Sequence, residues 1–419
     1  MLKVSVWRRV LGVDRATVIE GIDAEDNDRG EPVIVASVRP RRATKRRCGR
    51  CGQRAPGFDQ GDGRRRWRAL DLGTVRAYLE ADAPRVRCAG HGVVVAEVPW
   101  ARHGAGHTRD FDAVVAWMAV AMSKTAVTAV MRVAWTTVGA IIDRVVGEAR
   151  AAADPLEGLT RIGIDEISYK RGHRYLLIVV DHDSGRLVWA APGRDKATLH
   201  GFFDALNPMR CNQIRLVSAD AADWIATVVA ERCPNATLCL DAFHIVAWAT
   251  DALDEVRRET WNTARRGGMS GHARDLKHAR FALWKNPEDL TARQHAKLAW
   301  IAKVNGLLYR AYLLKEQLRM ALRIKGPLAM VMLTDWCEWA QRSRIPAFVE
   351  LSRRIRRHWD GIAAAMEHGL SNALIESTNT KLRVLTRVAY GFAKPEHLIA
   401  LALLDRGGYR PQLPGRQAT

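Results

Sequence analysis

Two short motifs near the N-terminal end of the chain have the spacing of metal ligands. Cys48 and Cys51 are separated by two residues, and Cys88 and His91 are separated by the same number. Two such pairs can supply the four ligands of a closed, structural zinc site that holds one Zn²⁺. The 36 residues between the pairs exceed the usual ribbon spacing, although they contain strand-like stretches. Two other histidines could replace His91 as the fourth ligand: His103 and His107.

Three carboxylates after residue 160 could bind divalent cations. Asp165 lies in the strand-like run RIGIDEI, which we expect to end there, and Asp220 ends the run IRLVSAD. Glu376 lies in a helical pattern, and its face of the helical wheel also carries Asn379, Thr380, Arg383 and Arg387. Hard cations prefer carboxylate oxygens, and two Mg²⁺ ions can activate a nucleophile and stabilise the leaving oxygen of a phosphodiester.

Other carboxylates compete with this set. Glu166 follows Asp165 directly, and strand alternation points the two side chains to opposite faces. Asp223 and Asp241 are rivals of Asp220 for the second position. The sequence pattern alone leaves these alternatives open.

The elements that must position these carboxylates form an alternating pattern over residues 160–245. The runs RIGIDEI, RYLLIVVD and RLVWAAP predict an antiparallel meander with a turn at residues 183–185. Helix-like stretches then separate the strand-like runs IRLVSAD and TLCLDAF. Such alternation predicts a mixed α/β sheet, in which ligand sites concentrate at the carboxyl ends of strands.

A helical segment before this sheet has the pattern of a DNA-binding motif. Two short helical patterns meet near residues 133–134, which is typical of a helix-turn-helix. The second helix would offer its N-terminal residues Trp135, Thr136 and Thr137 to the major groove. The arginines expected to contact DNA elsewhere are Arg64, Arg65, Arg66, Arg383 and Arg387.

The composition agrees with a nucleic-acid partner. The chain has 419 residues and a formal net charge of +20, from 65 Lys and Arg against 45 Asp and Glu, with 48% hydrophobic residues. This excludes a disordered tail protein and a small disulfide-stapled fold, and the charge favours a polyanion. The four cysteines without ligand spacing are interpreted as core residues: Cys211, Cys233, Cys239 and Cys337.

Five stretches together resemble one protein family, the ISL3-type transposases of insertion sequences. They are the CGRC and CAGH pairs followed by GVVVAEVPWAR, then RIGIDEISYKRGHRYLLIVVD, VSADAADW, LCLDAFHIV and SNALIESTNTKLRVLTRVAYGF. The stretches cover nearly the whole chain, and the last four are highly specific in this order.

The resemblance implies an RNase H-like domain whose catalytic, Mg²⁺-binding triad is Asp165, Asp220 and Glu376. It also implies that Asp241 and His244 match a C/D(2)H motif that follows the fifth strand. The 155 residues between Asp220 and Glu376 leave room for an all-α insertion. Its characteristic tryptophan would be one of Trp336, Trp339 and Trp284.

We therefore expect a multidomain α/β protein, with a zinc ribbon and a helix-turn-helix before an RNase H-like catalytic domain that carries an all-α insertion. The expected ranges are 1–45 (strand segment), 46–100 (zinc ribbon), 101–155 (helix-turn-helix), 156–245 (catalytic domain, first part), 246–365 (insertion) and 366–419 (catalytic domain, C-terminal helices).

The expected function is cut-and-paste DNA transposition, with binding of terminal inverted repeats, metal-dependent strand cleavage and strand transfer to target DNA. Two Mg²⁺ ions, replaceable by Mn²⁺, and one Zn²⁺ are the expected cofactors, and a homodimer or larger homo-oligomer is expected on DNA. The alternatives are a zinc-dependent DNA-binding regulator and an RNase H-like nuclease without strand transfer. The sequence shows no signal-peptide core and no membrane-length apolar run, so we expect a cytoplasmic, nucleoid-associated protein with no membrane partner.

Overall fold

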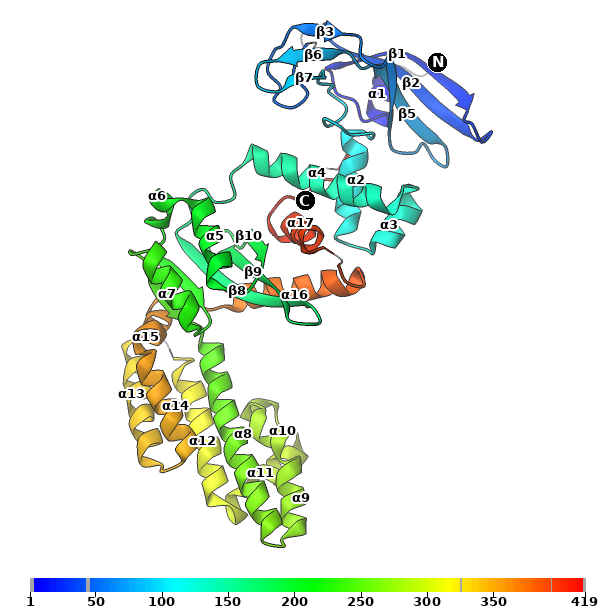
Figure 1. Ribbon diagram of the computed structural model, residues 1–419. Helices are drawn as coiled ribbons and strands as arrows, with labels where there is room; N and C mark the ends of the chain where they lie inside the picture. The colour runs from blue at the N-terminus through cyan, green and yellow to red at the C-terminus, as the bar shows by residue number, and fades with distance from the viewer. Residues whose placement is uncertain (1–3, 43–45, 325, 393, 417–419) are drawn as a thin grey trace. The chain divides into compact units, whose positions relative to one another are not determined.

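The computed structural model describes residues 4–42, 46–324, 326–392 and 394–416, and the chain divides into two compact units (Figure 1). Unit 1 comprises Met1–Pro155 and Val384–Thr419, and unit 2 comprises Leu156–Arg383. The boundary near residue 383 falls inside helix α16 (Ala373–Val388). The expected C-terminal range 366–419 is thus shared between the two units.

Unit 1 begins with a helix and two small sheets. Its first elements are α1 (Val4–Val10), β1 (Thr17–Asp26), β2 (Pro32–Pro40), β3 (Gly57–Asp59), β4 (Arg64–Arg68), β5 (Arg76–Asp82), β6 (Arg85–Cys88) and β7 (Gly92–Val95). One sheet has the order β1-β2-β5-β4 and the other has the order β3-β6-β7. The larger sheet packs around Trp67 and Trp100, whose rings meet edge to face at 5.5 Å.

Residues 1–45 do not form a separate strand segment. They contain β1 and β2, but β2 pairs in parallel with β5, so the sheet continues into the range expected for the zinc ribbon. The structure also adds helix α1, which the strand-like pattern did not predict. Trp7 of this helix, together with Leu11, packs against the sheet core, and this burial accounts for the helix.

Three helices follow in unit 1. They are α2 (Arg109–Ala119), α3 (Lys124–Met131) and α4 (Trp135–Ala152), and the side chains of Thr108 and Ser123 cap the first two. Arg132 ends α3 in the left-handed conformation, and the axes of α3 and α4 differ by 101°. No single helix of the described ranges is long and apolar enough to cross a membrane, although the bent α3–α4 pair passes the same test together.

The C-terminal helix belongs to unit 1. Helix α17 (Pro395–Arg406) packs against α4, and its apolar side includes Leu398 and Leu401. The predicted interruption at Gly391 before a final helix is confirmed, because Gly391 has a φ of 96° and follows the end of α16.

Unit 2 is built on a five-stranded sheet. Its elements up to the insertion are β8 (Arg161–Lys170), β9 (Arg174–Asp181), β10 (Leu187–Pro192), α5 (Lys196–Leu206), α6 (Pro208–Cys211), β11 (Leu216–Ala219), α7 (Asp223–Arg232) and β12 (Thr237–Leu240). The strand order is β10-β9-β8-β11-β12. Strands β8, β9 and β10 are antiparallel, whereas β11 and β12 run parallel to β8. The predicted meander and mixed α/β sheet are both confirmed.

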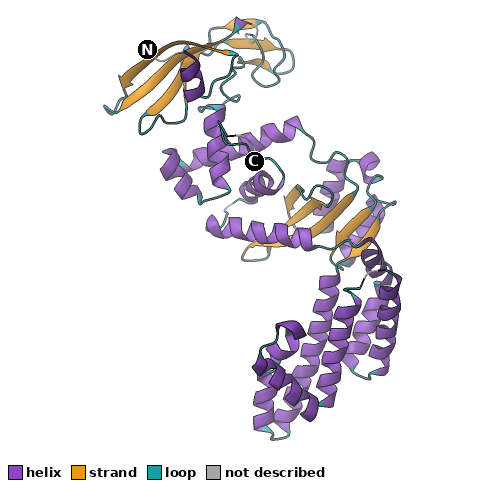
Figure 2. Cartoon of the chain, turned by 180° about the vertical axis from the view of Figure 1, so that it is seen from behind, coloured by secondary structure: helices purple, strands orange, loops and turns teal. Residues whose placement is uncertain are grey.

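A helical bundle separates β12 from α16, and Figure 2 shows it as helices. Its elements are α8 (Ala242–Arg266), α9 (Ser270–His278), α10 (Arg280–Trp284), η2 (Pro287–Asp289), α11 (Ala292–Val304), α12 (Gly306–Ala321), α13 (Pro327–Arg342), α14 (Pro346–Arg357) and α15 (Trp359–His368). Trp336 is fully buried in its core, and its indole N–H donates a 2.7 Å hydrogen bond to the carbonyl of Leu314. That environment gives Trp336 a packing role in this conformation.

Candidate active site and zinc site

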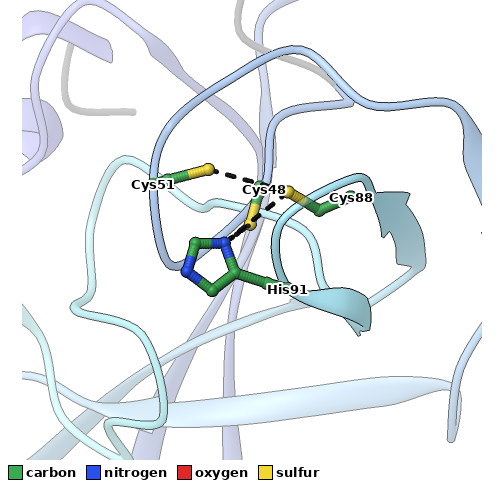
Figure 3. A group of neighbouring side chains, drawn as sticks. All are labelled: Cys48, Cys51, Cys88 and His91. Carbon is green, nitrogen blue, oxygen red and sulfur yellow. Dashed lines mark hydrogen bonds between the residues drawn. The ribbon is translucent and has the colours of Figure 1, made fainter.

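Cys48, Cys51, Cys88 and His91 converge in unit 1, with their ligand atoms all within 4.8 Å of one another (Figure 3). Cys51 Sγ lies 3.7 Å from Cys88 Sγ, and His91 Nδ1 lies 3.7 Å from Cys48 Sγ and 3.6 Å from Cys88 Sγ. A tetrahedron with arms of about 2.3 Å, the Zn–S distance, has edges of about 3.8 Å. The four side chains therefore have the separations that one zinc ion requires.

The surroundings of Cys48 favour a thiolate. Burial alone would raise its pKa, but hydrogen bonds from the backbone N–H groups of Cys51 and Arg50 leave the pKa of Cys48 below its ordinary value. The alternative ligands do not join the cluster. His107 stacks on Phe111 at 4.8 Å, and His103 lies against the backbone at residue 49.

In unit 2, strand register brings two aspartates together. Strand β11 pairs with β8 up to Ser218 opposite Gly163, so two residues further along Asp220 comes level with Asp165. We expected the strand to end at Asp165, but this prediction was wrong. Strand β8 continues to Lys170 because it pairs with β9 along the whole hairpin. The pairing with β11 stops at Gly163, and this leaves the β11 side of β8 open at Asp165.

The environment of Asp165 opposes its negative charge. Burial, and after it the charge of the neighbouring Asp220, raise the pKa of Asp165 from 3.8 to about 6. Two donors partly offset this effect: the Glu166 N–H at 2.7 Å from Oδ1, and the Asn379 amide at 2.6 Å from Oδ2. A cation placed between the two carboxylates would remove their repulsion.

His244 lies beside the second aspartate. Its Nδ1 is 3.0 Å from Asp220 Oδ1 and 3.2 Å from Asp241 Oδ2. Hydrogen bonds to Asp220 and Asp241 raise the pKa of His244 to about 10. Asp241 follows β12 directly and is buried, so α8 begins with a charged His–Asp pair at the edge of the sheet. His244 therefore contacts both Asp220 and Asp241, the two candidates for the second metal-binding carboxylate.

Two asparagines reach this edge of the sheet: Asn372, which directly precedes helix α16, and Asn379 within the helix. Asn372 donates its amide to Asp220 Oδ1 at 3.5 Å and its backbone N–H to Asp241 Oδ1 at 3.3 Å, while Asn379 contacts Asp165. Their exposed fractions are only 2% and 4%, and each amide oxygen is buried without a hydrogen-bond partner among the described residues. Buried amide oxygens without partners are unusual, and such oxygens are ligands of hard cations.

Glu376 lies in the first turn of α16, between these two asparagines in sequence. It is four residues after Asn372 and three before Asn379, so all three share one face. Among the described residues, however, only the Cys₃His cluster brings three or more His, Cys, Asp or Glu ligand atoms within 4.8 Å. The Glu376 carboxylate is exposed, and it does not form a three-carboxylate cluster with Asp165 and Asp220 within that distance.

A glycine permits the close approach of α16. A Cβ atom at Gly163 would lie 2.4 Å from Ile375 Cδ1, so any larger residue would push the helix away from β8. The sequence pattern identified Asn379 on the same face as Glu376 but gave it no role, and it missed Asn372. The i, i+4, i+7 spacing of Asn372, Glu376 and Asn379 was the available signal.

The competing acidic residues have other surroundings. Glu166 forms a 2.7 Å ion pair with Arg194, and Asp223 is exposed at the first position of α7.

The arginines predicted on β4 to bind DNA have partners within unit 1. Arg64 and Arg66 each lie 2.9 Å from a carboxylate oxygen of Glu80, and Arg65 donates to the carbonyl of Ala105 at 2.7 Å. These pairs organise the sheet surface, and they would have to rearrange before the arginines could contact phosphates.

The predicted helix residues are more accessible. Trp135 begins α4 with 56% of its surface exposed, and the Lys124 ammonium lies 3.4 Å from the centre of its ring. Of its neighbours, Thr136 is exposed and Thr137 is half-buried. Both predicted arginines of α16 are exposed: Arg383 and Arg387.

Comparison with known proteins gives matches along the chain. Residues 162–402 match the family model of ISL3 transposases, residues 96–146 match the helix-turn-helix domain of transposase family ISL3, and residues 44–91 match the zinc-finger of IS204/IS1001/IS1096/IS1165 transposases. The chain is 59% identical to the transposase for insertion sequence element IS1557 of Mycobacterium tuberculosis, over 99% of this chain and 98% of the relative. It is 29% identical to the IS1001 transposase of Bordetella parapertussis, over 56% of this chain and 58% of the relative.

Proposed function

The chain belongs to the ISL3 family of transposases, and from this premise we propose that it cleaves DNA at the ends of its own insertion element and joins the freed 3′ ends to target DNA. The observation that carries the proposal is the approach of Asp165 and Asp220 beside Asn372, which directly precedes helix α16, and beside Glu376 and Asn379 of that helix. The strand order β10-β9-β8-β11-β12, with three antiparallel strands and two parallel ones, supports an RNase H-like fold for this domain.

The side chains at this edge fit a divalent metal site. The repulsion between Asp165 and Asp220 and the partnerless amide oxygens of Asn372 and Asn379 are features that cations would satisfy. Asp165, Asp220 and Glu376 would hold two Mg²⁺ ions, and Mn²⁺ could replace them. When bound, such ions supply activation of the attacking oxygen and stabilisation of the leaving oxygen.

The chain's own residues have separate tasks in this proposal. Asn379 fixes the orientation of the Asp165 carboxylate, and Asn372 fixes Asp220 and Asp241 together. The charged His244 balances Asp220 and Asp241 on the side of the sheet where α8 begins. These contacts hold the carboxylates in place before DNA arrives, and such preorganisation lowers the cost of reaching the reactive geometry.

The N-terminal modules would select the DNA. We propose that the zinc-holding ribbon and the α3–α4 pair bind the terminal inverted repeats, with Trp135 and Thr136 facing the bases. Zn²⁺ held by Cys48, Cys51, Cys88 and His91 would stabilise the ribbon and take no part in the reaction. Two or more copies of the chain would assemble on the paired element ends.

The test is a reaction with purified full-length protein, Mg²⁺ and a labelled duplex that carries an element end. We expect cleavage at the element boundary, followed by joined products when target DNA is added. Cleavage without joining would favour a nuclease, and specific binding without cleavage would favour a DNA-binding regulator. Light scattering of the protein–DNA complex would measure the number of copies.

A further inference from the structure

Helix α14 carries an exposed face of arginines that the proposed chemistry does not use. Between residues 342 and 357 the chain has six arginines and one acidic residue, Glu350. Four of the arginines lie on α14 and are all exposed; we name them the α14 arginine face: Arg353, Arg354, Arg356 and Arg357. The opposite side of α14 is buried through Phe348, Leu351 and Ile355, so the helix is fixed with its charges outward.

Three of these arginines lie in the last turn of α14, where the helix dipole favours cations, but their mutual repulsion opposes the clustering. Arg353 and Arg357 are four residues apart, and like charges at that spacing destabilise a helix by about 0.2–0.5 kcal/mol. The only carboxylate paired with the face among the described residues is Glu350, an exposed partner 3.3 Å from Arg353. Burial lowers the pKa of Arg354, and the positive charge of Arg357 lowers it further. A negatively charged partner would relieve the repulsion between these arginines.

The α14 arginine face is connected to the candidate active site through α8. Helices α8 and α14 lie side by side (Figure 1). His244, which contacts Asp220, is four residues before Trp248 on α8, a rise of about 6 Å. The guanidinium of Arg354 lies 3.6 Å from the centre of the Trp248 ring, and His358 packs 5.8 Å from the same ring. The charges therefore begin about one helical turn from the carboxylates.

We infer that the α14 arginine face binds the phosphate backbone of duplex DNA that extends from the active site. The inference rests on the proposed function, because it assumes that DNA is cleaved at Asp165 and Asp220. Arg353 and Arg357 are about 6 Å apart along the helix axis, and one DNA strand carries about two phosphates over that length. Guanidinium groups bind phosphates bidentately and without regard to sequence, so this surface would hold DNA and leave selection to unit 1.

The test compares salt dependence in the full-length protein. The variant R353Q/R357Q removes two charges from the centre of the face, and R265Q/R266Q removes two exposed charges from the far end of α8 as a matched control. Binding of each protein to a duplex of unrelated sequence is measured by fluorescence anisotropy from 50 to 200 mM NaCl. Circular dichroism and thermal unfolding establish that both variants are folded.

We expect R353Q/R357Q to reduce the slope of log K against log salt by about 1.8, because each lost phosphate contact contributes about 0.9. Its affinity should then fall about tenfold less than that of the wild type over this salt range. The control should keep the wild-type slope. An unchanged slope in R353Q/R357Q would overturn the inference and leave the face to a protein partner, and an equal reduction in both variants would overturn it by showing a net-charge effect.

The proposed function is tested separately in the same preparation. Wild-type protein that binds the duplexes but leaves a labelled element end uncut refutes the proposed function, whereas the slope comparison still decides whether the α14 arginine face binds DNA. Hydroxyl-radical footprints on the element end should show that R353Q/R357Q loses protection beside the cleavage position and keeps protection within the repeat. Footprints identical to the wild type would contradict the inference.

Discussion

Replacing Asp165 by Asn should stabilise the metal-free protein while abolishing cleavage. In the folded chain, burial and Asp220 raise the pKa of Asp165 to about 6, whereas an unfolded aspartate has a pKa of about 3.9. The folded state therefore binds the proton more tightly than the unfolded state does. Stability falls as the pH rises from about 4 to about 6, and the whole penalty is present above pH 6.

The size of the penalty follows from the two pKa values. The pKa of Asp165 rises from 3.8 to about 6, and each pKa unit corresponds to about 1.4 kcal/mol, so the ionised carboxylate costs about 3 kcal/mol. An asparagine keeps only one oxygen for the two donors, the Glu166 N–H and the Asn379 amide, and losing one such hydrogen bond costs about 1 kcal/mol. The net gain expected for Asp165→Asn at pH 7.5 is about 2 kcal/mol.

Thermal unfolding of the full-length protein in a chelator measures this effect. For a unit of this size, about 2 kcal/mol corresponds to an increase of about 4–8 °C in the unfolding midpoint. The gain should disappear near pH 4, and Mg²⁺ should stabilise the wild type more than the variant. Asp223→Asn is the control. The Asp223 carboxylate is exposed at a helix N-terminus, where it slightly favours folding, so its replacement should not raise the unfolding midpoint. An Asp165→Asn protein that unfolds below the wild type at pH 7.5 without metal would refute the reasoning.

Three further outcomes follow from the two sites. In a gel assay with labelled DNA, Asp220→Asn and Glu376→Gln should each abolish cleavage of an element end while leaving repeat binding nearly intact. The double variant should be hardly less active than either single variant, and the control Glu166→Gln should keep substantial activity. Cys88→Ser should lose the zinc ion, as measured by elemental analysis, and the ribbon should unfold. A variant that lacks zinc but keeps the wild-type near-ultraviolet circular dichroism would contradict a structural role for zinc at this site. Asn379→Ala removes a partly buried 2.6 Å hydrogen bond to a carboxylate, worth about 1.5–3 kcal/mol, and should weaken both Mn²⁺ binding, measured by calorimetry, and cleavage. Unchanged Mn²⁺ affinity would mean that the amide has no positioning role.

The sequence alone was sufficient for features that depend on local pattern. The two-residue gaps of Cys48–Cys51 and Cys88–His91 predicted the three cysteines of the cluster and gave His91 as one of three candidate histidines, because a tight turn brings residues at this spacing to one point. Strand-like runs with a turn at residues 183–185 predicted the β8–β9–β10 meander, and helical periodicity predicted the helices on either side of Gly391. Periodicity is a property of neighbouring residues, so it survives without knowledge of the fold.

Only the tertiary structure decided which distant residues meet. His91, and neither His103 nor His107, faces the cysteines because β6 and β7 form a hairpin that places it there. Asp165 lies mid-strand beside Asp220 because the pairing of β11 with β8 ends at Gly163. The same glycine lets Ile375 pack on the sheet, which brings Asn372 and Asn379 onto carboxylates more than a hundred residues away. Strand register and helix approach depend on packing between segments remote in sequence, and no local pattern encodes such contacts.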